Sequence, residues 1–240
     1  MLELKNYSFE YVKGKRVINK INLYVKEGDI FAFVGRNGAG KSTTIKSIVG
    51  INHITEGSIL LDGVSLLKKP LEYKKNIAYI PDSPILYEYL TGIQYLNFIA
   101  DMYEISEKQR EEEIEKYAKR FELYNELGDL ISSYSHGMKQ KLVLIAAFMH
   151  NPKLYVLDEP FVGLDPKASH TLKEILKEKA QDNKIIFFST HVLDVAEKLC
   201  NKIAIIKDGK LIVDGMMKNV IEDKSLEEIF MELAIDDENN

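Results

Sequence analysis

Nine consecutive residues near the start of the chain have the types and the spacing that bind phosphate groups. They fit the pattern G-x-x-x-x-G-K-[ST], in which glycines let backbone amides approach phosphate oxygens and a lysine reaches the β- and γ-phosphates. The hydroxyl of this pattern joins the shell of a Mg²⁺ ion. A glycine-rich turn that binds nothing is the alternative, but it would not need glycine, lysine and serine together after an apolar strand. We therefore predict a nucleoside-triphosphate site at Gly35, Arg36, Asn37, Gly38, Ala39, Gly40, Lys41, Ser42 and Thr43.

Two carboxylates follow a second apolar run much further along the chain. Residues 154–157 are apolar throughout, which is typical of a core parallel strand whose carboxyl end faces a ligand crevice. At that end we expect Asp158 to hold Mg²⁺ through the shell that Ser42 completes. Glu159, one residue on, is expected to polarise a water for in-line attack on the γ-phosphate. Two acids after a strand can also cap a helix, but the P-loop upstream favours the metal and base roles.

Strands and helices alternate around both motifs. We expect a strand at 30–34 before the P-loop and β-rich structure throughout 2–34. Residues 1–82 and 153–240 are predicted to form one α/β core. Residues 83–152 contain few glycines and prolines and carry apolar residues at helical spacing, so they are predicted to be an inserted helical subdomain of a single domain, 1–240. Further predictions are helices at 111–121, 138–149, 167–180, 193–199 and 226–234, a type I′ hairpin at 207–210 and a frayed tail at 236–240.

Composition excludes several classes of protein. With 45% hydrophobic and 29% charged residues among 240, the chain has the balance of an ordinary globular protein, and its formal net charge of -5 argues against a general nucleic-acid-binding surface. The single cysteine, Cys200, excludes a disulfide framework within one chain. No apolar run approaches the roughly 18–20 residues that span a bilayer, and the mixed-charge start is unlike a signal peptide. We therefore expect a cytoplasmic protein.

Five further short segments accompany the two motifs, in an order typical of one protein family. The chain resembles the nucleotide-binding subunit of ATP-binding-cassette (ABC) transporters over nearly its whole length. Within that family, its sequence is similar to bacterial export-type ATPases. The resemblance implies a P-loop NTPase (RecA-like) α/β core with an N-terminal antiparallel β subdomain and an inserted α-helical subdomain. The matching segments are Tyr11, 80–82, 134–138, 163–166 and 189–191.

The resemblance assigns a role to each segment. Tyr11 matches the aromatic residue that stacks on adenine, with a core strand aromatic as the alternative. His191 matches the histidine that contacts the γ-phosphate, and Asp165 belongs to the loop that crosses to the opposite subunit, the D-loop. The family's L-S-G-G-Q signature, which binds the opposite subunit's nucleotide, falls on Ser135, His136, Gly137 and Met138.

Two of these segments depart from the family pattern. Asp82 stands where the family has the glutamine of its Q-loop; a carboxylate still ligates Mg²⁺ but reaches less far. In the signature, His136 replaces the first glycine and Met138 the glutamine. Ser135 and Gly137 remain, and they supply a hydroxyl and an N–H at a helix N-terminus for a γ-phosphate. We therefore expect this altered signature to bind a γ-phosphate as the family's signature does.

The resemblance implies a mechanism and a set of partners. Glu159 activates water while His191 and Lys41 stabilise charge on the γ-phosphoryl group of ATP, with Mg²⁺ as the cofactor. Two nucleotide-binding subunits, identical or related, enclose two ATP molecules and drive transport, with export favoured. The expected location is the inner face of the cell membrane, on separate membrane permease subunits and without nucleic acid. The alternative, a soluble ABC-type ATPase acting on the ribosome or DNA, would carry a coiled-coil, zinc-binding or second-cassette segment that is absent here.

A short apolar segment is the predicted contact with those membrane subunits. Residues 83–88 lie next to the Q-loop position and are apolar enough to receive a helix from a membrane partner. The alternative is that Ile85, Leu86 and Tyr87 pack beneath the helical subdomain. The sequence supports both interpretations equally.

Overall fold

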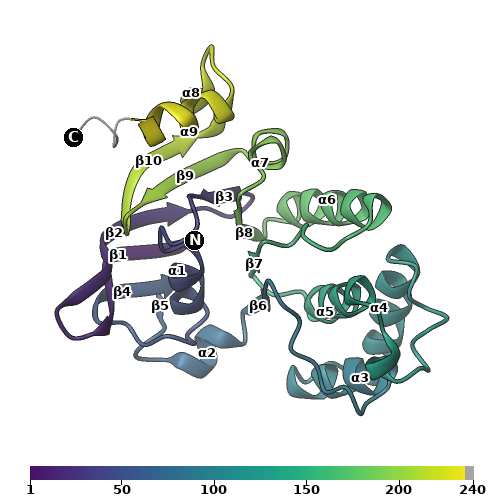
Figure 1. The fold of residues 1–240 in the computed structure, drawn as a ribbon. Helices are drawn as coiled ribbons and strands as arrows, with labels where there is room; N and C mark the ends of the chain where they lie inside the picture. The colour runs from purple at the N-terminus through teal and green to yellow at the C-terminus, as the bar shows by residue number, and fades with distance from the viewer. Residues whose placement is uncertain (236–240) are drawn as a thin grey trace.

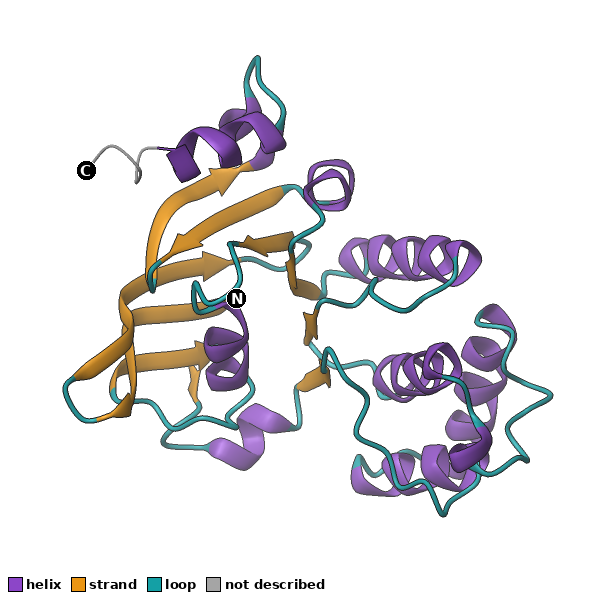
Figure 2. Cartoon of the chain, in the orientation of Figure 1, coloured by secondary structure: helices purple, strands orange, loops and turns teal. Residues whose placement is uncertain are grey.

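The computed structural model describes residues 1–235, so the tail predicted at 236–240 lies outside the described residues. Two sheets lie side by side, and a group of helices stands apart from them (Figures 1 and 2). The strands are β1 (Leu2–Val12), β2 (Lys15–Val25), β3 (Ile30–Val34), β4 (Glu56–Leu61), β5 (Val64–Ser65), β6 (Ile77–Ile80), β7 (Leu154–Asp158), β8 (Ile185–Thr190), β9 (Lys202–Lys207) and β10 (Lys210–Met216). The helices are α1 (Lys41–Ile48), α2 (Pro70–Lys74), α3 (Gly92–Met102), α4 (Glu107–Arg120), α5 (His136–Met149), α6 (Pro166–Gln181), α7 (Leu193–Leu199), α8 (Met217–Ile221) and α9 (Leu226–Ile235), with a 3₁₀ turn, η1 (Ile131–Ser133).

The first sheet is antiparallel and contains the N-terminal strands in the order β2-β1-β4-β5. Apolar side chains on one face of β1 and β2, among them Leu4 and Leu23 at paired positions, are fully buried. They pack toward α1, whose Ile45 and Ile48 belong to the same apolar cluster. This sheet is the N-terminal β subdomain that the sequence predicts.

The second sheet has the order β10-β9-β3-β8-β7-β6, and all its neighbouring strands are parallel except β9 and β10. Every residue of β3, β7 and β8 is buried, because helices or the first sheet cover both faces. Phe31 and Phe187, which are stacked, face α1 and the antiparallel sheet. Alternate residues such as Ala32 and Phe188 face the cluster that α5, α6 and α7 complete. The α/β fold class is thus confirmed.

Helices α3, α4 and α5 form the group on the right of Figure 1. Their core contains Tyr117, Phe121 and Phe148, and Phe148 also packs on Tyr155 of β7, with ring centroids 5.3 Å apart. Helix α4 begins at Glu107 rather than at 111, since the Ser106 side chain accepts the amide of the third helical residue. The group is therefore joined to the sheet through α5.

Other boundaries agree closely with the predicted ones. Helix α7 has the predicted limits, and the hairpin between β9 and β10 places Asp208 and Gly209 at φ 47° and 72°, as a type I′ turn requires. The short β5, α2 and α8 were not predicted. Within residues 1–235, no helix combines the length and the apolar character needed to cross a membrane.

Candidate functional site

Three predicted motifs meet because of the order of the parallel strands. The P-loop follows β3, the acidic pair ends β7, and the histidine segment ends β8, which lies between the other two strands. In register, Val34 of β3 is opposite Thr190 of β8, and Ser189 of β8 is opposite Asp158 of β7. The carboxyl ends of parallel strands share one edge of a sheet, so the motifs converge there.

The P-loop needs glycine at its two ends for different reasons. Gly40, which caps α1, has φ 111°, and a Cβ there would lie 2.5 Å from Ile18 Cδ1. Gly35 passes so near the neighbouring strand β9 that a Cβ would lie 2.5 Å from the carbonyl oxygen of Ile206. The loop therefore packs closely against β2 and β9. It leads directly into the amino end of α1, where backbone amides can bind phosphate.

Lys41 crosses the loop that precedes it. Its ammonium donates to the carbonyl of Gly35 at 2.7 Å and lies 3.4 Å from that of Arg36. Burial lowers the pKa of Lys41, while the negative charges of Glu159 and Asp158 act in the opposite direction. The ammonium group therefore lies close enough to both carboxylates for their negative charges to affect its pKa.

Asp158 is a buried carboxylate with two hydroxyl partners. Its side chain accepts from Ser189 Oγ at 2.5 Å and from the Ser42 hydroxyl. Burial raises the pKa of Asp158; the two hydrogen bonds lower it, and the nearby charges of Asp82 and Glu159 raise it further. Two of the three predicted metal ligands, Ser42 and Asp158, are thus in contact, and the third, Asp82, is near enough for its charge to act on Asp158.

The donor set at this place suits a hard divalent cation. A hydroxyl and carboxylate oxygens are the ligands that Mg²⁺ prefers, and Mg²⁺ in nucleotide sites takes few protein ligands and fills its shell with phosphate oxygens and water. Among residues 1–235, no group of three or more His, Cys, Asp or Glu side chains is arranged to hold a metal by itself. Ser42 and Asp158 therefore fit a cation that arrives with a nucleotide.

Glu159 leaves the strand in an unusual conformation. Its φ of 50° lies in the left-handed region, which non-glycine residues seldom adopt and which is concentrated at functional sites. Its amide donates to Ser189, to Oγ at 3.1 Å and to the carbonyl oxygen at 3.3 Å. Its Oε2 accepts the His191 amide at 3.3 Å and lies 3.0 Å from His191 Nδ1. The predicted base and the predicted histidine are in direct contact.

Tyr11 lies beside the P-loop, near the amino end of α1. Its hydroxyl is 3.1 Å from Thr43 Oγ1, and its ring meets the edge of Phe9 with centroids 4.7 Å apart. The ring is 62% exposed, so Tyr11 is not a core aromatic. An exposed ring anchored beside the P-loop can stack on a planar base.

The signature and the D-loop contact each other instead of the P-loop. Ser135 caps α5, and His136 lies against Gly163, where a Cβ would be 2.7 Å from the imidazole Cδ2. Asp165 caps α6 and forms an ion pair with Lys141 of α5 at 2.8 Å. Within residues 1–235, no hydrogen bond or ion pair joins residues 135–138 to residues 35–43.

Sequence reasoning gave no role to two residues that organise this region. Ser189 contacts both acidic residues, and Lys141 fixes the D-loop to the signature helix. Ser189 does leave a signal in the sequence. It is a polar residue in an otherwise apolar strand, at a position where the alternation of side chains predicts a core residue. Lys141 gives no such signal, because charged residues are ordinary on helices.

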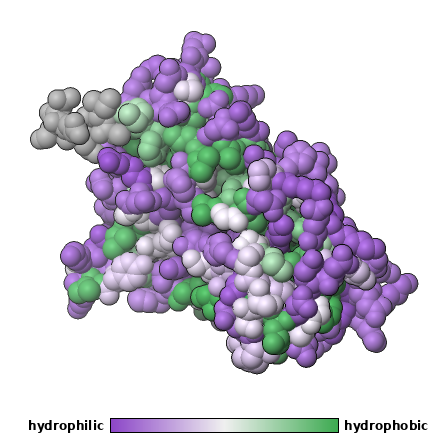
Figure 3. Space-filling view, turned by 45° about the vertical axis from the view of Figure 1, so that its right-hand side comes forward, coloured by the Kyte–Doolittle hydropathy of each residue, from purple (hydrophilic) through white to green (hydrophobic). Residues whose placement is uncertain are grey.

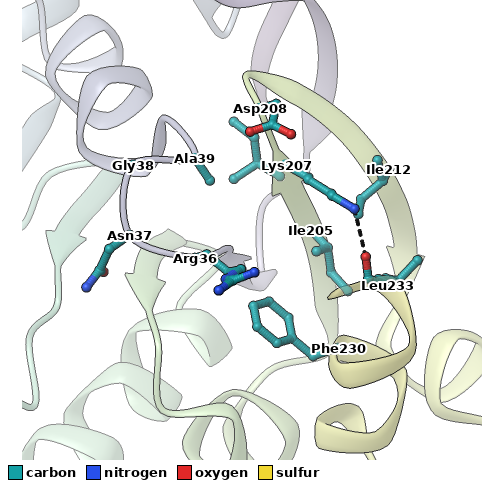
Figure 4. Close-up of a pocket in the computed structure, with 11 residues that line it drawn as sticks. Arg36, Asn37, Gly38, Ala39, Ile205, Lys207, Asp208, Ile212, Phe230 and Leu233 are labelled. Atoms are coloured by element: carbon teal, nitrogen blue, oxygen red, sulfur yellow. Dashed lines mark hydrogen bonds between the residues drawn. The ribbon is translucent and has the colours of Figure 1, made fainter. Parts of the chain in front are cut away.

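A cavity of about 340 Å³ borders the first half of the P-loop. Figure 4 shows it between that loop, the β9–β10 hairpin and α9, with the Lys207 ammonium donating to the carbonyl of Leu233 at 2.8 Å. Among the described residues, Lys41, Asp158 and Glu159 do not line it. The cavity therefore lies beside the P-loop and not at the two carboxylates that follow β7. Its lining residues are Arg36, Asn37, Gly38, Ala39, Ile205, Ile206, Lys207, Asp208, Ile212, Phe230 and Leu233.

Comparison with known proteins defines the class. Residues 18–162, more than half of the chain, match the family model described as ABC transporter. The chain is 33% identical over 242 residues to the ABC-type transporter ATP-binding protein EcsA of Bacillus subtilis (strain 168), an alignment that covers 99% of this chain and 98% of EcsA. The chain belongs to the ABC transporter family and is an ATPase of that family.

Two further comparisons agree in length and in fold. The chain is 34% identical over 214 residues to the SkfA peptide export ATP-binding protein SkfE of the same organism, covering 89% of this chain and 88% of SkfE. A solved structure described as the ATP binding subunit of an ABC transporter superposes with a TM-score of 0.94 at 36% identity, covering 98% of this chain and 99% of the other. The described fold is thus that of the ATP-binding subunit of an ABC transporter.

Proposed function

We propose that this chain binds and hydrolyses Mg-ATP as one subunit of a dimer that powers transport through separate membrane proteins. The observation that carries the proposal is the meeting of Lys41, Asp158 and Glu159 at one edge of the parallel sheet. A phosphate-binding lysine, a metal-binding carboxylate and a general base are the groups that phosphoryl transfer to water requires.

Binding follows from the P-loop and its neighbours. The amides of residues 35–43 and the amino end of α1 hold the phosphates, and Lys41 moves its donors from loop carbonyls to phosphate oxygens. Ser42 and Asp158 hold Mg²⁺, assisted by Asp82. When bound, Mg²⁺ neutralises charge on the β- and γ-phosphate oxygens. The exposed ring of Tyr11 stacks on adenine.

Hydrolysis depends on the orientation of Glu159. His191 engages Oε2 of Glu159 through its backbone amide and its ring, so Oε1 is the oxygen that accepts a proton from the attacking water. The imidazole is 58% exposed at the edge of the site, where its Nε2 can contact the γ-phosphoryl group. Lys41 stabilises the charge that develops on that group.

A second nucleotide-binding subunit, identical or related, completes each site. Residues 135–138 and Asp165 form one contiguous surface through the His136–Gly163 contact and the Lys141–Asp165 ion pair. Within residues 1–235, no hydrogen bond or ion pair joins that surface to the P-loop. This supports a role for the surface at the nucleotide of the opposite subunit. The γ-phosphate then links the two subunits, and hydrolysis releases them.

The docking surface for the membrane subunits is proposed at 83–89. Ile85 is 88% exposed and Tyr89 is 75% exposed, as a docking surface requires. Leu86 instead packs on the helical core, as the alternative interpretation expects. Figure 3 shows that one face of the molecule is largely hydrophilic with small apolar patches. Exposed apolar side chains beside the Q-loop position suit a helix from a membrane subunit. The subunit would then lie on the inner face of the membrane, and the likeness to SkfE supports export.

A pull-down tests this proposal. Tagged Glu159→Gln protein, captured from detergent-solubilised membranes in Mg-ATP, is expected to retain a polytopic membrane protein. The matched variant adds Ile85→Glu, which leaves the P-loop untouched and is expected to abolish that recovery while ATP binding persists. Recovery of ribosomes or nucleic acid with no membrane protein would overturn the transport role.

A further inference from the structure

Ser189 makes contacts that no predicted role explains. It is fully buried at the end of β8, where its Oγ donates to Asp158 Oδ1 at 2.5 Å and accepts the Glu159 amide at 3.1 Å. Its carbonyl oxygen accepts the same amide at 3.3 Å. One hydroxyl therefore uses both its donor and its acceptor capacity on the two acidic residues.

The sheet explains why this residue occupies that place. Side chains alternate along β8, so Ser189 shares a face with Phe187, which packs toward α1. On β7, Asp158 shares that face with Val156. The apolar layer beneath α1 consequently ends in a buried hydroxyl beside a buried carboxylate, at the level of the carboxyl edge of the sheet.

We propose that Ser189 is a positioning residue that orients the carboxylate of Asp158 for metal binding and holds the backbone of Glu159 in its left-handed turn. The proposal rests on the proposed function of the site. By occupying Oδ1 of Asp158, Ser189 fixes the rotation of the carboxylate and leaves Oδ2 available to the cation.

The second half of the proposal concerns Glu159. A left-handed conformation persists at a non-glycine residue only when surrounding contacts impose it. The amide of Glu159 makes the last bond of the ladder between β7 and β8, to the carbonyl oxygen of Ser189, and Ser189 Oγ accepts the same amide. Removing the hydroxyl leaves one of these acceptors, so the side chain of Glu159 would be less firmly directed toward His191.

The test separates metal binding from nucleotide binding. We compare the wild-type protein with Ser189→Ala and Ser189→Thr, measuring the affinity for ADP in EDTA and the Mg²⁺ concentration that half-saturates its effect at fixed ADP. Ser47→Ala is the matched control, because Ser47 is equally buried and bonded, to Tyr7 and Thr43, but contacts neither acid. Thermal melting checks that every variant is folded.

Ser189→Ala is expected to raise the half-saturating Mg²⁺ concentration by roughly 10–100-fold, the usual cost of removing a residue that orients a metal ligand. Its ADP affinity in EDTA is expected to stay within about twofold of wild type, because the substitution weakens only the metal site. The P-loop, which binds the phosphates, is untouched. At saturating Mg²⁺ we expect a lower kcat with an unchanged KM for ATP. Ser189→Thr should restore both values, and Ser47→Ala should alter neither.

Each contrary result has a distinct meaning. An unchanged Mg²⁺ midpoint contradicts the role toward Asp158, and an unchanged kcat contradicts the role toward Glu159. Equal losses of ADP affinity with and without Mg²⁺ would reduce Ser189 to a structural residue and overturn the proposal. If the wild-type protein bound no nucleotide at all, the proposed function itself would fail.

Discussion

Two adjacent carboxylates differ in what their surroundings let them do. Asp158 is the last residue of a strand, buried and bonded to two hydroxyls, and burial raises its pKa. Glu159 has turned out of the strand, and its side chain is 17% exposed. Asp158 is held against the Ser42 hydroxyl, whereas the side chain of Glu159 is held against His191 at the edge of the site. This contrast is why we propose the metal for Asp158 and the water for Glu159.

The first prediction isolates the base. Glu159→Gln keeps the size and the contacts of the side chain but removes its ability to accept a proton. We expect nucleotide binding to persist while single-turnover release of phosphate slows by roughly 10²–10⁴-fold, the usual contribution of a general base. Glu174→Gln, on the exposed face of α6, is the control and should leave the rate unchanged. Wild-type turnover in Glu159→Gln would remove Glu159 from the role of base.

Among the elements, α6 is bound to the helical group by an ion pair near each of its ends. Arg120 at the end of α4 makes a bidentate ion pair with Glu178 of α6, at 2.6 and 2.8 Å. At the other end of α6, Asp165 pairs with Lys141 of α5. Because both pairs cross between elements, they set the orientation of α6 against α4 and α5.

The second prediction concerns the pH dependence of the Arg120–Glu178 pair. The hydrogen bonds from Arg120 lower the pKa of Glu178 in the folded state below its ordinary value of 4.5. The stabilisation is therefore complete above 4.5 and is lost as the pH falls through the lowered folded-state pKa. Since the Glu178 side chain is half exposed, we expect Glu178→Gln to reduce the free energy of unfolding by about 0.5–1 kcal/mol at neutral pH.

Urea unfolding of both proteins over a series of falling pH values measures this gap. We expect the difference between wild type and Glu178→Gln to shrink toward zero in acid. Glu174→Gln, one turn earlier on α6, serves as the comparison and should change stability little. A difference that stayed constant with pH would mean that the pair does not stabilise the fold through its charge.

How far the sequence predicts these elements depends on how local their causes are. The type I′ turn at Asp208 and Gly209 and the limits of α7 follow from neighbouring residues, and both were correct. The bond between Ser189 and Asp158 joins strands that become neighbours only when the sheet assembles in the order β3-β8-β7. The Lys141–Asp165 pair likewise depends on the packing of α5 beside the loop before α6. Such contacts are non-local, so periodicity and motif spacing do not contain them.

At the scale of the whole molecule, the proposed function assigns one chain two halves of different sites. The P-loop half lies at the edge of the parallel sheet, and the signature half lies at the start of α5 and in the D-loop. A two-fold symmetric pair brings the first half of each subunit to the second half of the other, so both nucleotides are enclosed together. Under the proposed function, the dimer is therefore the working unit and ATP is part of its interface.

The most direct test of this account is the mass of Glu159→Gln in solution, measured by light scattering after size-exclusion chromatography. The single chain has a mass of 27.5 kDa. With Mg-ATP we expect about twice this mass, because a two-fold pair has two copies, and with Mg-ADP we expect the single-chain mass. Adding Ser135→Arg, which places a bulky cation at the signature without touching the P-loop, should keep the protein monomeric while it still binds ATP. A mass that did not respond to ATP, or a dimer that survived Ser135→Arg, would contradict the shared site.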